Sequence, residues 1–256
     1  MRYYIIAGEA SGDLHGSNLI KGLYAEDPQA EIRFWGGDLM SEVAGHSGLV
    51  RHYKEGAVMG FVEVLAKAGK LLNNVSFCKK DILEWKPDVV ILIDYPGFNF
   101  KIAEFAHKAG FKVFYYIAPK VWASREGRIR KLKAYVDKLF IVFPFEKPYF
   151  DAKGIDYIYK GNPLVDAVDG SKAMIESRTD FMVRNGLSDG PYIAMLAGSR
   201  KAEISTMMPV LTEFAAKMKA LPQYAGYRFI IAGAPARTMK DYEQWLNEDN
   251  KDPHCF

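Results

Sequence analysis

The sequence predicts an α/β protein built on a doubly wound parallel sheet. Short apolar runs alternate with helix-like or turn-rich segments, as expected for repeated βαβ units. The run Val89–Ile93 is apolar throughout, which is typical of a central parallel strand buried on both faces. A turn of small residues, Gly8–Gly12, separates the first apolar run from a helical pattern. These three observations together indicate the fold class.

The first strand and its turn form the first candidate site. Strand 3–7 runs through glycines and a serine into a helix expected over 15–26. Backbone N–H groups at such a helix N-terminus can bind an anion or a polyhydroxy ligand. The turn carries neither a Walker motif nor the dinucleotide pattern Gly-x-Gly-x-x-Gly. A plain βα turn in which Asp13 caps the helix is equally consistent with these residues.

Further strands follow in order along the first part of the sequence. Pro87-Asp88 introduces the run 89–93, and turn or helix patterns separate the other apolar runs. The strands expected in this part are 3–7, 31–35, 89–93, 112–116, 138–142 and 157–160.

A second, Rossmann-like unit opens near residue 191. A polar-faced helix is expected over 171–185, and Asp189-Gly190-Pro191 marks a boundary. Strands at 192–196 and 228–232 then flank a helix at 202–220. We therefore expect domains at 1–165 and 166–256. Two strands cannot form a stable parallel sheet alone, so the second domain is expected to be incomplete and the protein truncated.

Composition and charge exclude several classes of protein. The 256 residues are 49% hydrophobic with a net charge of +3, which gives no reason to expect a nucleic-acid partner. Two distant cysteines, Cys78 and Cys255, favour a reducing compartment, and the five histidines show no metal-ligand spacing. We expect no metal and no cofactor. With no signal-peptide pattern and no membrane-length apolar run, the protein is expected in the cytoplasm.

Asp94 directly follows the apolar run 89–93 and is the first candidate catalytic residue. Ligands of open α/β sheets bind outside the carboxyl ends of the strands, so this carboxylate is expected to face such a crevice. Partial burial would raise its pKa and suit it to general-base catalysis. The competing interpretation is a carboxylate that caps the next helix or forms a turn.

Gly198-Ser199-Arg200 follows the first strand of the second unit in the same way. Ser199 is expected to cap the helix that begins near Ala202, whose N-terminus favours phosphate. The Arg200 guanidinium can bind a diphosphate oxygen. Alternatively, Arg200 is a solvated residue on a capped helix.

Two further stretches suit an amphiphilic or anionic partner. Residues 118–133 contain six basic residues, one acid and Trp122, which favours a phosphorylated sugar or acidic lipid, with Arg125 as the expected contact. Residues 57–77 are more apolar than one core-facing stripe requires and are flanked by lysines. That pattern fits acyl chains or a membrane surface, and equally a helix buried between a sheet and its neighbour.

The segment Ala7–Asp13 resembles the N-terminal signature of the lipid-A-disaccharide synthases, a family of bacterial glycosyltransferases. Six further stretches resemble this family in the same order, and together they span nearly the whole sequence. They are AVMGFVEVL at 57–65, IDYPGFN at 93–99, APKVWA at 118–123, PFEK at 144–147, GNPL at 161–164 and LAGSR at 196–200.

The resemblance implies a GT-B fold of two Rossmann-like domains, the second cut short. It also implies an inverting transfer of 2,3-diacylglucosamine from UDP to 2,3-diacylglucosamine 1-phosphate. Asp94 would be the base, while Arg200 and the helix start would stabilise departing UDP. Many members carry a second acid where this sequence has Gly97, and a second tryptophan where it has Ser124. No paired-carboxylate mechanism is therefore expected.

The same resemblance implies binding roles for other residues. Those expected near the substrates or the nucleotide are Ser11, Gly12, Asp13, Met59, Gly60, Glu63, Asn99, Arg125, Asn162, Gly198, Ser199 and Arg200. The expected partners are the UDP-linked diacylated donor, the phosphorylated diacylated acceptor, the cytoplasmic surface of the inner membrane and, at full length, a second copy in a homodimer. A UDP-N-acetylglucosamine 2-epimerase-like enzyme and a non-catalytic lipid- or anion-binding fragment remain alternatives.

Overall fold

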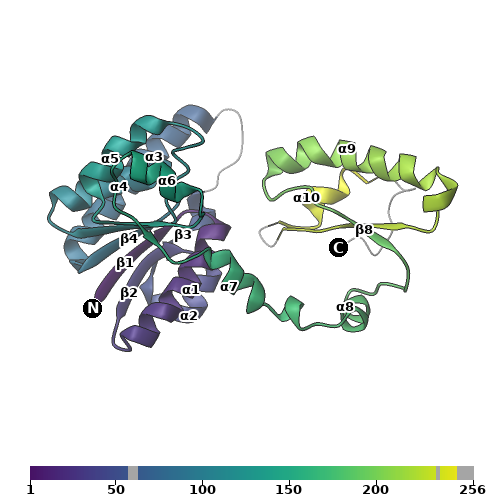
Figure 1. Ribbon diagram of the computed structural model, residues 1–256, viewed down its shortest axis with the longest axis horizontal. Coiled ribbons are helices and arrows are strands. Elements are labelled where there is room, and N and C mark those ends of the chain that lie inside the picture. Colours follow the sequence, from purple (N-terminus) through teal and green to yellow (C-terminus); the bar gives the residue numbers. More distant parts are fainter. Residues whose placement is uncertain (57–62, 235–236, 247–256) are drawn as a thin grey trace. The chain divides into compact units, whose positions relative to one another are not determined.

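The computed structural model describes residues 1–56, 63–234 and 237–246 (Figure 1). The protein divides into two compact units, Met1–Ser171 and Lys172–Phe256. The boundary expected after residue 165 falls inside helix α7 (Pro163–Asp169), so the division comes just after that helix.

The first unit is built on a seven-stranded sheet in which every pair of neighbouring strands is parallel. The strands run in the order β3-β2-β1-β4-β5-β6-β7. Their bounds are β1 Arg2–Ala7, β2 Glu31–Gly36, β3 Leu49–His52, β4 Val89–Ile93, β5 Lys112–Tyr116, β6 Lys138–Ile141 and β7 Ile158–Tyr159. The predicted α/β class is confirmed. Strand β3 was not predicted from the sequence, because this short edge strand has only two apolar residues.

Helices cover both faces of this sheet (Figure 1). The cluster that contains Tyr4 and Ile6 of β1 also contains buried residues of α3, α4, α5 and α6, whereas Tyr3 and Ile5 pack on the other face with α1 and α2. Strands buried on both faces have no polar face to present, which explains the unbroken apolar run of β4. The helices are α1 Ala10–Glu26, α2 Asp38–Ala44, α3 Glu63–Trp85, α4 Pro96–Lys108, α5 Ile129–Tyr135, α6 Glu146–Ala152 and α7.

The strand order places a topological switch point between β1 and β4. From β1 the polypeptide moves outward to β2 and β3, and it then returns to β4 and moves the other way to β7. Connections leaving β1 and β4 on opposite sides open a crevice at the carboxyl ends of these two strands. The turns after β1 and β4 therefore define the place where a ligand is expected.

The second unit contains a two-stranded parallel sheet, β8 (Tyr192–Met195) with β9 (Arg228–Ile231), within the described residues. Helices α9 (Lys201–Lys219) and α10 (Lys240–Glu243) supply Ile204, Met208 and Tyr242 to its buried cluster. The prediction of a single helix over 171–185 is wrong. These residues instead form a short 3-10 turn and then α8 (Arg178–Arg184), because Ser177 accepts a hydrogen bond from the Asp180 N–H and starts a new helix.

Candidate functional site

The turn after β1 lies directly against the turn after β4. A Cβ atom on Gly8 would collide with the ring of Tyr95, so only glycine leaves room for the tyrosine. Helix α1 begins at Ala10, about one turn earlier than expected, and Ser11 and Gly12 are among its first residues. Ser11 is exposed there, whereas Gly12 is buried. The turn after β1 and the turn after β4 are thus packed directly against each other at the switch point.

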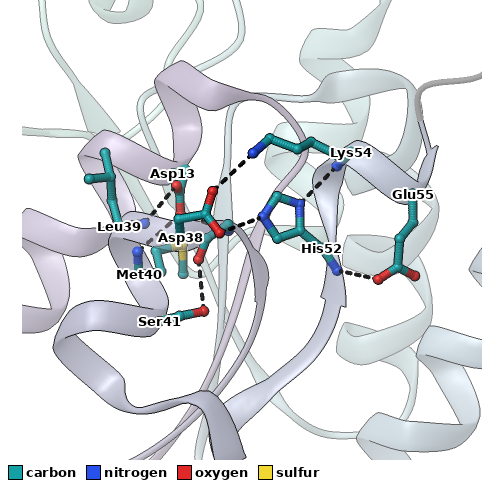
Figure 2. A network of polar contacts seen from close by, with 9 residues as sticks. Asp13, Asp38, Leu39, Met40, Ser41, His52, Lys54 and Glu55 are labelled. Carbon is teal, nitrogen blue, oxygen red and sulfur yellow. Dashed lines mark hydrogen bonds and ion pairs between the residues drawn. The ribbon is translucent and has the colours of Figure 1, made fainter. Parts of the chain in front are cut away.

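Asp13 lies inside α1 and does not cap it, because the helix starts before it. The residue is 2% exposed. Its Oδ1 accepts hydrogen bonds from the N–H of Gly37 (2.7 Å) and Met40 (3.1 Å), and its Oδ2 accepts one from Leu39 (3.1 Å) (Figure 2). Asp13 therefore caps α2 from a distance. Its carboxylate is occupied by backbone donors, and the predicted contact of Asp13 with a substrate stays a prediction.

A charged network beside this cap ties the end of β3 to α2 (Figure 2). Asp38 contacts Nε2 of His52 at 3.2 Å and Nζ of Lys54 at 2.9 Å. The Lys54 N–H donates to Nδ1 of His52 (3.1 Å), which assigns the ring hydrogen to Nε2. The hydrogen bond from Lys54, and then that from His52, lower the pKa of Asp38. This network was not predicted from the sequence, because its members lie far apart along it.

The turn after β4 holds two consecutive non-glycine residues in the left-handed region. Asp94 has φ 41° and Tyr95 has φ 46°, and in the neighbouring turn Ile117 has φ 65°. Ile93 and Tyr116, which precede Asp94 and Ile117, are paired in the β4–β5 register, so the strained residues sit together. Each such residue costs about 1–3 kcal/mol, and strain of this kind concentrates at functional sites.

Two buried side chains hold this turn in place. The backbone carbonyl oxygen of Asp94 accepts hydrogen bonds from Nδ2 of Asn99 (2.8 Å) and from the Tyr115 hydroxyl (2.7 Å). Burial, followed by the charge of Asp94, raises the pKa of Tyr115 well above its usual value, so the hydroxyl remains a donor. Asn99 is fully buried and also binds the carbonyl oxygen of Ile93. The Nδ2 group of Asn99 therefore positions this turn, and its expected contact with substrate stays a prediction.

Asp94 itself is an exposed residue at the carboxyl end of β4. The partial burial expected for it is wrong, because the backbone turns outward in the left-handed conformation immediately after the strand. The helix after it, α4, begins at Pro96 with Tyr95 at its N-cap. What singles Asp94 out is its place at the switch point and the rigid support of its backbone.

The basic segment after β5 contains an anchored aromatic cluster. Nε1 of Trp122 donates to Glu146, which is 1% exposed and also accepts from the N–H of Val142 and Phe143. The Trp122 ring meets Phe145 edge-on at 4.9 Å between centroids, and both residues are exposed. Arg125 is also exposed, with φ 57°. The role of Glu146 was missed, although the PFEK stretch contains it.

A pocket of about 120 Å³ opens at the carboxyl ends of β5, β6 and β7. Asn162 lies on it and is the N-cap of α7, where its Oδ1 accepts from the Leu164 N–H (3.0 Å). From the sequence, Asn162 was assigned to the nucleotide together with Gly198, Ser199 and Arg200. The structure places Asn162 in the first unit and the other three residues in the second.

In the second unit, Glu203 rather than Ser199 caps α9. Its Oε2 accepts from the N–H of Ser199 (2.9 Å) and Arg200 (3.1 Å), and its Oε1 accepts from Nη1 of Arg200 (3.0 Å). These bonds, the Ser199 N–H first, lower the pKa of Glu203. Gly198, with φ 97°, allows the backbone to pass close to Glu203. A second arginine reaches the same turn, since Nε of Arg237 donates to the carbonyl oxygen of Ser199 at 2.7 Å.

The apolar stretch expected near acyl chains is only partly covered by the structure. Met59 and Gly60 lie outside the described residues, and Glu63 is the first residue of α3, although its side chain is not described. Along the described part of α3, Val75, Cys78 and Ile82 are buried in the core. Leu72, Phe77 and Leu83 are 58%, 44% and 47% exposed. The helix therefore has both a core face and exposed apolar residues.

The sequence pattern of the lipid-A-disaccharide synthetase family matches residues 3–256 of this protein. A lipid-A-disaccharide synthase of Geobacter metallireducens is 41% identical over 241 residues, which is 94% of this sequence and 61% of the relative. A lipid-A-disaccharide synthase of Trichlorobacter lovleyi is 38% identical over 247 residues, which is 96% of this sequence and 62% of the relative. The sequence therefore spans about three-fifths of the length of these curated relatives.

Several solved structures share the fold of this protein at low sequence identity. UDP-GlcNAc 2-epimerase from Neisseria meningitidis bound to UDP-GlcNAc matches with a TM-score of 0.67 at 14% identity, covering 97% of this protein and 70% of that one. UDP-GlcNAc 2-epimerase from Methanocaldococcus jannaschii in complex with UDP-GlcNAc and UDP matches with a TM-score of 0.64 at 17% identity. The match covers 99% of this protein and 70% of that one. At this level of identity the likeness shows a GT-B-type fold and nothing about the reaction. Within the described residues, no helix has the length and hydropathy needed to cross a membrane.

Proposed function

Because the protein belongs to the lipid-A-disaccharide synthetase family, we propose that it performs the acceptor-activating part of a glycosyl transfer. In this reaction the 6-hydroxyl oxygen of 2,3-diacylglucosamine 1-phosphate attacks the anomeric carbon of UDP-2,3-diacylglucosamine. The hydroxyl proton passes to a base, the bond to UDP breaks, and the anomeric configuration inverts. The products are the β-1,6-linked lipid A disaccharide 1-phosphate and UDP.

Asp94 is the proposed base. The observation that carries this proposal is the strained turn at the switch point, in which the backbone of Asp94 is fixed by two buried side chains. Asn99 and Tyr115 both donate to the carbonyl oxygen of Asp94, so two buried side chains fix its backbone. Asp94 is exposed, so an incoming hydroxyl can reach a base whose backbone is already held in position.

The turn after β8 is the proposed binding place for the departing diphosphate. Arg200 and Arg237 both reach this turn, and the N–H groups of Ser199 and Arg200 lie at the start of a helix of 19 residues. Guanidinium groups and helix N-termini stabilise the negative charge that develops on a leaving phosphate. The proposal thus assigns the base, Asp94, to the first unit and the cationic groups, Arg200 and Arg237, to the second.

The acyl chains and the membrane complete the proposal. The exposed Leu72, Phe77 and Leu83 on α3, together with exposed Trp122 and Phe145, offer apolar surface on segments that also contain basic residues. Such surfaces suit the interface of an anionic lipid layer. We therefore expect peripheral attachment to the cytoplasmic face of the inner membrane, and a homodimer at the length of the relatives.

The test is a transfer assay in detergent with radiolabelled UDP-2,3-diacylglucosamine and the diacylated 1-phosphate acceptor. The 256-residue protein and a version extended to the length of the relatives are assayed side by side, the second also with Asp94→Asn. Loss of the base should lower kcat by at least about 100-fold. Asp156→Asn, which alters an exposed aspartate before β7, is the matched control and should leave turnover unchanged. Normal turnover in Asp94→Asn would remove the base assignment.

A further inference from the structure

The pocket at the carboxyl ends of β5, β6 and β7 combines an apolar floor with a polar rim. Val142 lines its buried floor, and the half-buried rings of Tyr116 and Phe140 form its wall. Lys160 and Asp166 stand exposed at its rim. A pocket of this make-up suits a small ligand with an apolar face and several polar groups.

This pocket lies one strand away from Asp94. Asp94 follows Ile93, which is paired in register with Tyr116, and Tyr116 is paired in turn with Phe140. Neighbouring strands are about 4.8 Å apart. The backbone of Tyr116, which lines the pocket, therefore lies about 4.8 Å from that of Ile93, the residue before Asp94.

The charges on the rim specify the ligand more closely. Lys160 has an ammonium group, which donates hydrogen bonds to phosphate oxygens. Asp166 has a carboxylate, which accepts hydrogen bonds from hydroxyl groups and repels a bare anion. Asp166 lies close enough to Tyr116 for its charge to contribute, after burial, to a raised pKa of that tyrosine. A ligand that satisfies both rim charges needs hydroxyl groups as well as a phosphate.

We infer that this pocket binds the glucosamine 1-phosphate headgroup of the acceptor, with the sugar ring against Tyr116, the phosphate at Lys160 and a ring hydroxyl at Asp166. The inference rests on the proposed function and adds an acceptor subsite to it. Seated there, the headgroup is held by the same unit that contains Asp94, while the donor nucleotide is left to the second unit. Lys160 is then a residue that discriminates a phosphorylated acceptor from an unphosphorylated one.

The experiment measures binding, so it does not depend on transfer. Isothermal titration of the 256-residue protein compares glucosamine 1-phosphate, glucosamine and inorganic phosphate at millimolar concentrations. Lys160→Met should weaken binding of glucosamine 1-phosphate by about tenfold and leave glucosamine nearly unchanged. Lys160→Arg should restore most of the loss. Lys138→Met is the matched control, because Lys138 is also exposed but lies at the amino end of β6, away from the carboxyl ends of the strands where the pocket opens.

A second readout separates the subsite from the reaction. In the extended protein, Lys160→Met should raise KM for the acceptor with little change in kcat or in KM for the donor. Equal effects of Lys160→Met and Lys138→Met, equal binding of inorganic phosphate and glucosamine 1-phosphate, or no binding to the unaltered protein would each overturn the inference. Headgroup binding that depends on Lys160 in a protein without transfer activity would support the pocket and overturn the proposed function alone.

Discussion

Replacing Asp13 with alanine tests whether one buried carboxylate organises the end of the sheet where β1 and β2 finish. The substitution removes the acceptor for the N–H groups of Gly37, Leu39 and Met40. Gly37 and Met40 are buried, so water cannot fully replace the lost bonds without structural change. Hydrogen bonds to a charged group contribute about 1.5–3 kcal/mol each, and losses within one cap are not additive. We therefore expect unfolding of the first unit to become easier by about 3–5 kcal/mol.

Asp13→Asn separates the charge from the acceptor. The amide oxygen can still accept from Gly37 and Met40, which both bind Oδ1, but its NH₂ group faces the N–H of Leu39. An intermediate loss of about 1–2 kcal/mol is expected. Glu42→Gln is the control, because Glu42 is exposed in the same helix that Asp13 caps and its replacement should change stability by less than about 0.5 kcal/mol.

Urea unfolding followed by tryptophan fluorescence provides the assay. Trp35, Trp85 and Trp122 lie in the first unit and Trp245 lies in the second. A Trp245→Phe background therefore makes the signal report the first unit. If Asp13→Ala and Glu42→Gln shift the midpoint equally, the cap does not organise this part of the fold and the reasoning is refuted.

Two other predictions follow from the same structure. Gly8→Ala places a methyl group against the Tyr95 ring and should destabilise the first unit by about 1–3 kcal/mol. Gly97→Ala is the control and should be nearly neutral, because a Cβ atom there meets open space. Equal urea midpoints for the two variants would contradict this prediction. The pKa of Glu203 is lowered in the folded protein, so its contribution to stability is present above its unfolded pKa of about 4.3 and is lost as the pH falls through the folded value. Glu203→Gln should therefore remove part of the acid destabilisation of the second unit in guanidinium titrations between about pH 6 and pH 3, and an unchanged pH profile would count against the cap.

Much of the fold follows from apolar periodicity and could be predicted. Strands such as Val89–Ile93 are buried on both faces, so their sequence has a strong signal. The edge strand Leu49–His52 is half-buried along its length and has almost none. The prediction of a single helix over 171–185 was wrong because one capping serine, Ser177, sets the start of the separate helix α8.

The sequence named candidate residues for the site, and their roles stay predictions, whereas the contacts that support them were not predicted. Asp94 was proposed because it directly follows a strand, and Arg200 because it lies in the turn after one; the structure confirms both of these places in the fold. The partners Asn99, Tyr115 and Glu203 act through backbone atoms, and such contacts leave no pattern in the spacing of residues. The alternative interpretation of Asp13 as a cap named the wrong helix, because its three donors come from a segment more than twenty residues away.

The carboxylate of Glu203 has a consequence for any anion that arrives at the start of α9. It already occupies the two backbone donors that a phosphate would use there, and it neutralises part of the charge of Arg200. A phosphate that takes these donors must first release the glutamate, so one anion is exchanged for another. For the diphosphate proposed to bind at this turn, Glu203 is an internal competitor whose return would help the ligand to leave.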